Sequence, residues 1–454
     1  MSLIQIAWRN FCHRALSSFL TTLSLALGVG LVVLVISIYG VISEAFVRNA
    51  SVGYNLVVGP KGSALQLTLN SVFYLSQPIE NLPYTEYMEF FPQQERADMV
   101  ARYGGDPAVG QRDGIYADFI AGGYVIPIAL GDYLGEFRVV GTTSAFFKHL
   151  RFGPDVDKPF QYRDGRPLKD FDEHNTFFEA VLGARVADQM GISVGDMMKV
   201  SHGTPDGDGH GQGFRVVGIL DSTGTPNDRA AFVNLEGFYL LEKHSKPVDE
   251  GAINLPATDP VGANSGFTPL TIPEREVTSI LVRNGNLFLA PTMQNMINEG
   301  VLSQAAAPIG EINKLMESIV GPLLKALMAI TLITCVVAAV GVLVAIYNSM
   351  NDRRRDIAVM RALGARRDTV TMIILGESLI IALVGGLTGW LLAHGAIQIA
   401  SGYIEAQTGI QVWMFTLSSY ELAILPLVLI LALFAGLLPA LSAYRTDVGS
   451  NLSN

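Results

Sequence analysis

Cysteine is almost absent from this chain of 454 residues, which contains only Cys12 and Cys335. Both lie beside or inside apolar stretches, and neither lies in the acidic region between residues 48 and 317. A disulfide framework therefore cannot hold that region together. A region of about 270 residues is long enough to fold around an apolar core of its own.

Charged residues are scarce as well: they make up 16% of the chain, against about 25% in soluble proteins. The mean hydropathy of +0.35 is nevertheless low for a protein built only of membrane helices. The composition therefore predicts a few membrane helices and a sizeable soluble domain. Between residues 48 and 317, 33 Asp and Glu face 21 Lys and Arg. This acidic excess argues against a nucleic-acid partner, because binding phosphates requires cations.

Motifs for nucleotide binding and metal-dependent hydrolysis are missing. The chain is expected to lack a Walker sequence, a His-Glu-x-x-His pattern and a Gly-x-Ser-x-Gly motif. The run 59–62 (GPKG) is predicted to be a turn, because a phosphate-binding loop needs a longer Gly-rich stretch that ends in Lys-Ser or Lys-Thr. We therefore expect no catalytic site and no bound cofactor on this chain, so that any energy source is used by another chain.

The Gly-rich stretch 201–213 (SHGTPDGDGHGQG) gathers side chains of the type that bind metals. Its spacing does not fit a calcium loop, because no Glu stands at the twelfth position, and the other histidines are scattered along the chain. We therefore interpret the stretch as a solvated hairpin tip and expect no metal centre. The candidate ligands, if a metal were bound, are His202, Asp206, Asp208 and His210.

Four apolar stretches are long enough to cross a bilayer: 17–46, 319–350, 370–400 and 420–444. Arginines precede the first, cluster between the second and third, and follow the fourth. By the positive-inside rule these flanks are cytoplasmic, including the tail 445–454. The region 47–318 and a short loop, 401–419, are then expected outside. The first apolar run is longer than that of a cleaved signal peptide.

Residues 1–16 are predicted to form an amphipathic helix at the inner membrane surface, because Leu3, Ile6 and Phe11 recur at helical spacing. The alternative is that this segment is merely the flank of the first span.

The region 47–318 is predicted to be a mixed α+β domain, without the regular alternation of a doubly wound parallel sheet. A distal subdomain is expected at about 145–245. Alternating apolar residues predict strands at 55–58, 136–140, 197–201, 214–220, 230–233 and 278–282. Helical patterns occur at 84–102, 179–190, 235–244 and 291–306.

The segment 351–369 (NDRRRDIAVMRALGARRDT), here called the coupling segment, predicts a short cationic helix that ends at Gly364. Simple positive-inside anchoring would explain its arginines. Anchoring does not explain the apolar face that contains Ile357 and Met360, which needs a partner surface or lipid.

These motifs resemble those of the MacB/FtsX-like family of ABC transporter permeases. The run RRRDIAVMRALGARRDTV, the Glu that opens the next span, its glycines and the ending LPALSAYRTDV are all similar to the permease module of that family. The segments 180–200 and 214–236 are similar to the outer domain of MacB-like proteins, whereas 59–135 matches least. The resemblance assigns ATPase coupling to Arg353, Arg354, Arg355, Asp356, Ile357, Met360, Arg361, Ala362, Leu363, Gly364 and Ala365.

The resemblance implies an α-helical membrane protein with four spans and a periplasmic domain, in a bacterial inner membrane, with both termini cytoplasmic. Two such subunits, identical or paralogous, would stand on a dimer of separate ABC ATPases that bind ATP and Mg. ATP-driven closure would move the outer domains, a process called mechanotransmission, to support export or extraction of an unidentified substrate. A periplasmic adaptor or substrate-binding protein is a further expected partner.

Small residues within the spans predict close helix packing. Charged residues near the span ends, such as Lys325 and Glu377, are interpreted as snorkelling to the interface. The residues assigned to packing in the spans are Gly28, Gly385, Gly386, Gly389 and Glu377.

Two other functions stay open. The chain could be an FtsX-like regulatory scaffold that controls a cell-wall hydrolase or another periplasmic partner, although the outer domains of that group are smaller. It could also be a peptide sensor that signals to a kinase, although that group usually carries more spans.

Overall fold

The computed structural model describes residues 3–13, 15–50, 53–152, 157–203, 209–242, 244–248, 253–352 and 354–408, together with residues 426, 430 and 437. The chain divides into two compact units. The helical unit comprises Met1–Glu44, Glu317–Glu405 and Gln411–Asn454. The sheet unit comprises Ala45–Met316 and Ala406–Ile410.

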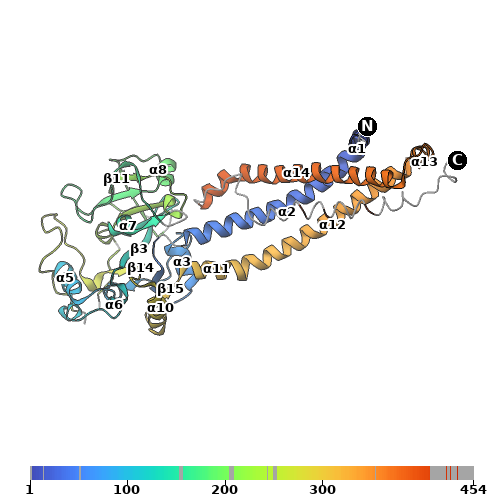
Figure 1. The fold of residues 1–454 in the computed structure, drawn as a ribbon. Helices are drawn as coiled ribbons and strands as arrows, with labels where there is room; N and C mark the ends of the chain where they lie inside the picture. Colours follow the sequence, from blue (N-terminus) through green and yellow to red (C-terminus); the bar gives the residue numbers. More distant parts are fainter. Residues whose placement is uncertain are drawn as a thin grey trace. The chain divides into compact units, whose positions relative to one another are not determined.

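The described part of the helical unit consists of α-helices, a π-helical turn at 316–320 and a turn at 363–366 (Figure 1). Among the described residues of the chain, three stretches are long and apolar enough to cross a membrane: Ala15–Gly40, Pro308–Gly341 and Asp368–Tyr403. The fourth predicted span, 420–444, lies outside the described residues except for 426, 430 and 437. The helices are α1 (Leu3–His13), α2 (Ala15–Asn49), α12 (Gly321–Asp352), α13 (Arg354–Ala362) and α14 (Arg367–Thr408).

Two boundaries of these helices bear on the sequence predictions. A separate short helix, α1, does occupy part of the segment 1–16. Residues 401–408 of the loop predicted over 401–419 belong to α14, which continues to Thr408, and the rest of that segment lies outside the described residues. Residues 401–408 (SGYIEAQT) contain no proline, which is the residue that breaks a helix most strongly.

The sheet unit is built on an eleven-stranded mixed sheet with the order β15-β1-β14-β3-β4-β12-β8-β11-β7, in which β10 also pairs with β3 and β9 with β11. The pairs β4–β12 and β8–β11 are parallel. The strands of this sheet are β1 (Leu56–Pro60), β3 (Tyr124–Leu134), β4 (Phe137–Thr142), β7 (Tyr162–Gly165), β8 (Glu179–Leu182), β9 (Met197–Met198), β10 (Ser201–His202), β11 (Phe214–Leu220), β12 (Ala230–Asn234), β14 (Ser279–Arg283) and β15 (Ser303–Ala306).

Short strands and helices complete this unit, and the mixed α and β content that the sequence predicted is confirmed. The small pairs are β2 (Leu82–Pro83) with β13 (Glu276–Val277), and β5 (Arg151–Phe152) with β6 (Lys158–Pro159). The α-helices are α3 (Ala64–Ser71), α4 (Tyr84–Met88), α5 (Gln93–Tyr103), α6 (Ala117–Ile120), α7 (Ala145–His149), α8 (Ala184–Met190), α9 (Leu235–Tyr239), α10 (Ala290–Glu299) and α11 (Pro308–Leu315). The 3₁₀ turns are η1 (Pro107–Gly110), η2 (Pro226–Arg229), η3 (Ile272–Glu274) and η4 (Leu287–Leu289). The π-helical turn η5 (Met316–Val320) lies where the sheet unit ends at Met316 and the helical unit resumes at Glu317.

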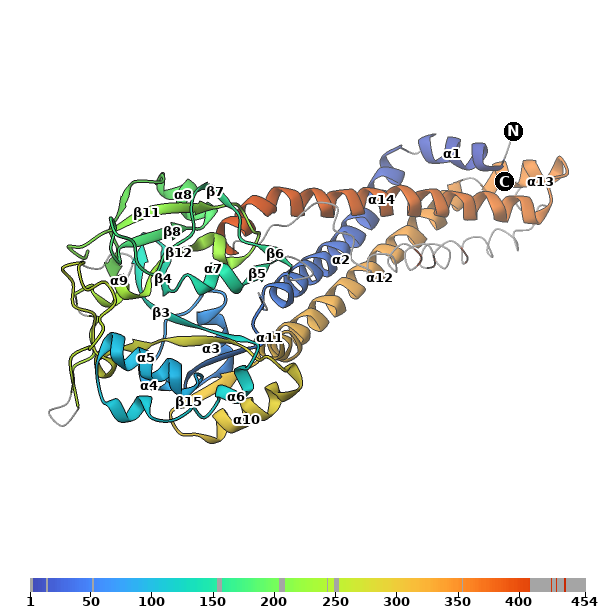
Figure 2. The same ribbon diagram turned by 60° about the vertical axis from the view of Figure 1, so that its left-hand side comes forward.

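The sheet unit has two apolar cores, and β3 passes from one to the other (Figure 2). We call the part around the core that contains Leu56, Met88 and Ile297 the first lobe, and the part around the other core the second lobe. The first half of β3 pairs with β14 in the first lobe, and its second half pairs with β4 in the second lobe. The core of the second lobe runs from Ala129 to Leu241. This lobe therefore begins earlier than the distal subdomain predicted at about 145–245, because the end of β3 and all of β4 belong to it.

Three of the predicted helices are divided in the structure. The pattern at 84–102 is two helices, because α5 starts afresh after Pro92. The pattern at 179–190 starts with strand β8, which is buried at all four positions and therefore lacks the alternation that identifies a strand. The pattern at 291–306 ends with strand β15, since α10 stops at Gly300.

Candidate functional site

The coupling segment forms α13, a tight turn and the start of α14. The turn is a Schellman motif: the Ala365 N–H donates to the Met360 carbonyl at 3.0 Å, and the Gly364 N–H donates to the Arg361 carbonyl at 3.1 Å. Gly364 has a φ of +101°, a conformation that side chains other than glycine rarely adopt. The glycine that the sequence predicted as the helix end therefore reverses the chain between α13 and α14.

The two faces of α13 have different surroundings. Ala358 is buried, and Met360 packs against the apolar core that α2 and α14 share. Val359 is 42% exposed and Leu363 is 84% exposed. These two apolar side chains thus form an uncovered surface, here called the apolar knob.

The structure describes the remaining residues of the coupling segment unevenly. Arg361 and Ala365 are half-buried, while Ala362 and Gly364 are exposed. The backbone of Arg354, Arg355, Asp356 and Ile357 is helical, but their side chains and all of Arg353 lie outside the description.

Helices α2 and α14 approach each other through glycines (Figure 1). A methyl group on Gly389 would lie 2.4 Å from the Ala26 carbonyl oxygen, and one on Gly30 would lie 3.1 Å from the Gly389 carbonyl oxygen. A methyl group on Gly385 would lie 3.2 Å from the Thr22 carbonyl oxygen. Small residues four apart on both helices thus bring the two backbones together. Gly28 and Gly386, the other glycines assigned to packing, are buried.

Two ionisable side chains of α14 are buried within the helical unit. Glu377 is 7% exposed, which differs from the predicted snorkelling, because this part of α14 faces protein: its neighbour Gly376 lies against Ala7 of α1. His394 is 1% exposed and its ring packs on Trp390, with the ring centroids 4.4 Å apart. The sequence analysis singled out no role for His394, although an ionisable residue inside a span is itself a signal.

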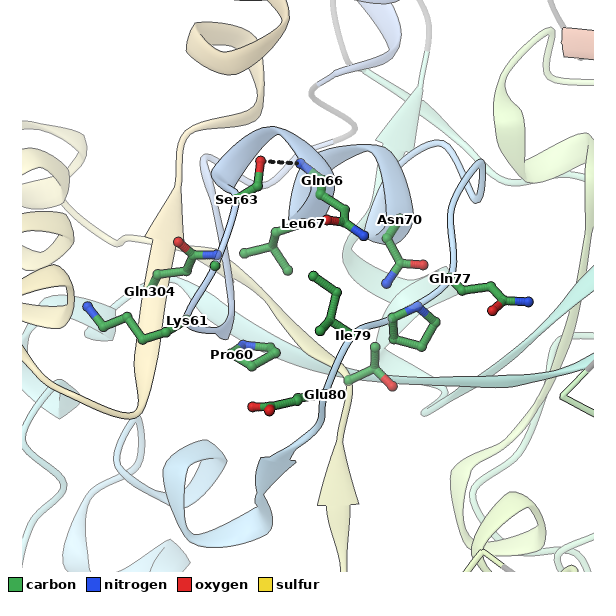
Figure 3. A pocket seen from close by; sticks show the side chains of 13 residues that line it. Pro60, Lys61, Ser63, Gln66, Leu67, Asn70, Gln77, Ile79, Glu80 and Gln304 are labelled. Atoms are coloured by element: carbon green, nitrogen blue, oxygen red, sulfur yellow. Dashed lines mark hydrogen bonds between the residues drawn. The ribbon is translucent and has the colours of Figure 1, made fainter.

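The segment 59–135, where the sequence analysis found the weakest resemblance, lines a small hollow beside α3 (Figure 3). Leu67 of α3 and Ile79 face into it, and Ser63 caps α3 by accepting a hydrogen bond from the Gln66 N–H at 3.3 Å. The free volume is about 30 Å³, which is room for water and not for a substrate. The run 59–62 ends β1 and bends into α3.

Residues 191–195 (GISVG) match the Gly-x-Ser-x-Gly spacing of hydrolases. The prediction that the chain has no catalytic motif missed this match. The nucleophile elbow of those enzymes leads from a strand into a helix. Here the motif leads from α8 to β9, and the Ser193 N–H donates to Asp196 Oδ2 at 2.8 Å. The serine therefore belongs to a turn.

The predicted tip 201–213 has two candidate ligands in the described part of the chain. His202 and His210 come together, with ring centroids 5.7 Å apart, while Asp206 and Asp208 lie outside the described residues. Two further residues, Asp132 and His244, join them. Because these are distant in sequence, no local motif could have identified them.

Comparison with known families assigns both halves of the chain. The sequence model of the MacB-like periplasmic core domain matches residues 18–263, and that of the FtsX-like permease C-terminal matches residues 328–448. The first match alone covers more than half of the chain, and the second contains the coupling segment.

Curated relatives agree with this assignment. An uncharacterised ABC transporter permease of Methanocaldococcus jannaschii is 24% identical over 58% of this chain and 57% of its own length. The uncharacterised ABC transporter permease YknZ of Bacillus subtilis is 29% identical over 32% of this chain and 34% of its own. The macrolide export ATP-binding/permease protein MacB of Bordetella avium is 34% identical over 27% of this chain and 18% of its own length. The matched region thus spans less than two thirds of each relative. The chain belongs to the MacB/FtsX-like family of ABC transporter permeases.

Proposed function

We propose that this chain is the membrane subunit of an ABC transporter that a separate ATPase drives by mechanotransmission. The observation that carries the proposal is the apolar knob. Val359 and Leu363 are exposed on a cationic helix that a glycine-dependent turn fixes between two apolar helices. An exposed apolar surface of this kind favours a protein partner, and an ABC ATPase carrying ATP and Mg fits that role.

A path for motion starts at this knob. Met360, next to it on α13, packs against the core shared by α2 and α14. The glycine contact at Gly389 leaves no space for α2 and α14 to approach further or to slide freely. Displacement of α13 would therefore move α14 and α2 together. Helix α2 is continuous to Asn49, and its last residues, Ala45–Asn49, already belong to the sheet unit.

A second membrane subunit, identical or paralogous, fits the surface of α12. In an 18-residue apolar window of Pro308–Gly341, only 6% of the residues are buried within the chain, against 39% in the window of Ala15–Gly40 and 50% in that of Asp368–Tyr403. Its exposed residues include Leu323 and Ile333. A dimer in which α12 lines the contact between subunits, with lipid on its other faces, would cover this surface.

The setting that fits best is a bacterial inner membrane, with both termini in the cytoplasm and the sheet unit in the periplasm. There the sheet unit would support export or extraction of a substrate, together with an adaptor or binding protein. The relatives named for macrolide export make export the leading direction, while the cargo itself is not specified by the chain.

The decisive experiment replaces the apolar knob. The Val359→Asp/Leu363→Asp variant, tagged and purified from its native membranes, should lose the vanadate-sensitive ATP hydrolysis that co-purifies with the wild type. Two central contacts of about 2 kcal/mol each would lower the bound ATPase more than tenfold. The matched control is Phe288→Asp/Val301→Asp, two apolar residues of the sheet unit that are 92% and 86% exposed. Full ATP hydrolysis in the knob variant would refute the docking proposal.

The regulatory scaffold is less well supported. The sheet unit matches the MacB-like periplasmic core domain, and the outer domains of FtsX-type regulators are smaller. Cell-wall hydrolysis that depends on the chain but is unaffected by the presence of any exported compound would favour the scaffold over the transporter.

A further inference from the structure

Asp132 is a fully buried carboxylate at an irregular point of the central strand. It lies on β3 where the pairing with β4 shifts register between Leu130 and Tyr133. Such a bulge turns a side chain away from the normal alternation of a strand. On the other edge of β3, Asp132 pairs with His202 of β10.

Three histidines surround this carboxylate. Asp132 Oδ1 lies 3.2 Å from His202 Nδ1 and 3.2 Å from His244 Nε2. Asp132 Oδ2 lies 3.2 Å from His210 Nε2. His202 Nδ1 and His244 Nε2 are themselves 3.2 Å apart, and the four ligand atoms all lie within 4.8 Å of one another. These residues are here called the three-histidine cluster.

The cluster is not satisfied by its internal hydrogen bonds. Asp132 Oδ2 and His210 Nε2 are buried and close, yet their orientation gives neither of them a hydrogen bond within the described part of the chain. No lysine or arginine of that part forms an ion pair with Asp132. A buried carboxylate and a buried ring nitrogen without a properly directed partner are costly, and a cation between them would compensate for both.

We propose that Asp132, His202, His210 and His244 form a binding site for a divalent transition-metal ion such as Zn²⁺. Three imidazole nitrogens and one carboxylate are ligands that Zn²⁺ prefers in tetrahedral sites. Four ligands at the usual Zn–N distance of about 2.0–2.1 Å lie about 3.3–3.4 Å apart at the corners of a tetrahedron. The three 3.2 Å separations among Asp132 Oδ1, His202 Nδ1 and His244 Nε2 match three edges of that tetrahedron, and the four ligand atoms of the cluster all lie within 4.8 Å of one another.

An ion can reach the cluster from solvent. The side chains of His210 and His244 are 4% exposed, whereas that of His202 is 41% exposed. His202 and His244 line a cavity of about 550 Å³ that also contacts Gln77, Lys246 and Glu276. The ion would therefore exchange through the His202 side, while Asp132 holds it from the buried side.

The four ligands come from three separate segments. Asp132 lies on β3, His202 and His210 flank the tip 203–209, and His244 follows α9, where its ring packs on Phe238 with the centroids 4.3 Å apart. The Ser201–Gly209 bridge and the His210 N–H bond to the Val200 carbonyl already join the two arms of the hairpin. A bound ion would cross-link the hairpin and the segment after α9 to the central sheet, so metal binding should stabilise the second lobe.

The test measures metal binding by the full purified chain. The protein is isolated through a tag without histidines, stripped with EDTA and titrated with Co²⁺, whose visible absorption reports tetrahedral ligation by nitrogen, and then with Zn²⁺. We expect one ion per chain and a higher Tm with Zn²⁺. His202→Gln changes the exposed ligand, so this variant should fold normally. Its affinity for the metal should fall by at least as much as when a hydrogen-bond partner of a ligand is lost, which is about 10–100-fold. His210→Gln should abolish the Co²⁺ spectrum.

The matched control is His174→Gln, because His174 is exposed and lies outside the cluster. It should bind metal as the wild type does. The proposal is overturned if the wild type gives no Co²⁺ spectrum, which is the outcome expected for a solvated tip without a metal centre. It is equally overturned if His202→Gln and His210→Gln bind Zn²⁺ as tightly as His174→Gln. Metal binding by the isolated chain needs no ATPase, so these outcomes do not depend on the proposed coupling.

Discussion

Arg275 and Glu236 form a bidentate ion pair inside the sheet unit, with Nη1–Oε1 and Nη2–Oε2 distances of 2.7 and 2.6 Å. The guanidinium of Arg275 is fully buried and lies 3.6 Å from the centroid of the Tyr103 ring. Burial lowers the pKa of Arg275, but the attraction of Glu236 outweighs it and raises the pKa above its ordinary value. Glu236 is next in sequence to Leu235, which belongs to the core of the second lobe. Arg275 lies in sequence between Ile272 and Val277, which belong to the core of the first lobe. The ion pair therefore links the two lobes.

Removing one partner of this pair should be far more harmful than removing both. Arg275→Met leaves the Glu236 carboxylate buried without its cation, and we expect the free energy of unfolding to fall by about 3–5 kcal/mol. The double variant Arg275→Met/Glu236→Met should recover much of that loss. Urea unfolding of the full chain in detergent, followed by the near-ultraviolet signal of its tyrosines, measures the difference. A single variant within about 0.5 kcal/mol of the wild type would show that the pair is not important for stability.

The glycine contact in the helical unit gives a second prediction. Gly389→Ala places a methyl group against the Ala26 carbonyl oxygen at 2.4 Å, so α2 and α14 must separate and the Tm of the helical unit should fall. Gly395→Ala is the matched control, since a methyl group there meets nothing within 4 Å on the same helix. It should leave the Tm unchanged or raise it, because alanine is the better helix former. Scanning calorimetry of both variants in nanodiscs makes the comparison, and equal Tm values would contradict close packing at Gly389.

Glu89 should make the first lobe sensitive to acid. Burial raises the pKa of this carboxyl, but Arg112, the Ile115 N–H and Arg96 together hold the pKa below its ordinary value. A lowered pKa in the folded state means that the stabilisation is fully present above the ordinary glutamate pKa of about 4.3 and is lost as the pH falls through the folded-state value.

The variant Glu89→Gln tests this dependence. At pH 7 it leaves Arg96, whose side chain is 1% exposed, without its charged partner, and we expect a loss of about 1–3 kcal/mol in unfolding free energy. The difference from the wild type should shrink as the pH is lowered below about 4.3. Glu95→Gln, on the exposed side of α5, serves as the control and should change little. A difference that is the same at every pH would exclude the carboxylate charge as its cause.

Phe232 lies at the centre of an aromatic cluster on β12. Its ring centroid is 4.8 Å from that of Phe146 and 5.4 Å from that of Phe147. Because Phe232 is fully buried, Phe232→Ala should lower the unfolding free energy by about 3–5 kcal/mol. Phe288→Ala removes the same atoms from a side chain that is 92% exposed, and it should stay within about 0.5 kcal/mol. Similar losses in the two variants, measured by urea unfolding, would show that this cluster does not stabilise the lobe.

Local patterns were enough to find several elements. The alternation over 214–220 predicted β11 with the bounds that the structure has. The apolar runs predicted the long helices α2, α12 and α14, and Gly364 predicted the end of α13. Each of these rests on neighbours within a few residues, because the period of a strand or a helix and the glycine that ends it are local properties.

Patterns failed where burial is complete. β8 is buried on both faces, so its residues do not alternate and the stretch resembled the start of a helix. Likewise, the burial of Glu377 and His394 depends on which face of α14 meets α1 and α2, and a uniformly apolar helix carries no sequence signal for that choice.

The sequence by itself determined the apolar helices, the coupling segment with its turn at Gly364, and the family. Only the tertiary structure decided which residues the histidines meet. His202 is 70 residues from Asp132 and 42 from His244, and no periodicity relates positions that far apart. Their meeting depends on the pairing of β10 with β3 and on the bulge that turns Asp132 inward. Strand register and bulges of this kind are set by the packing of the whole domain, which is why the three-histidine cluster could not be predicted from the sequence.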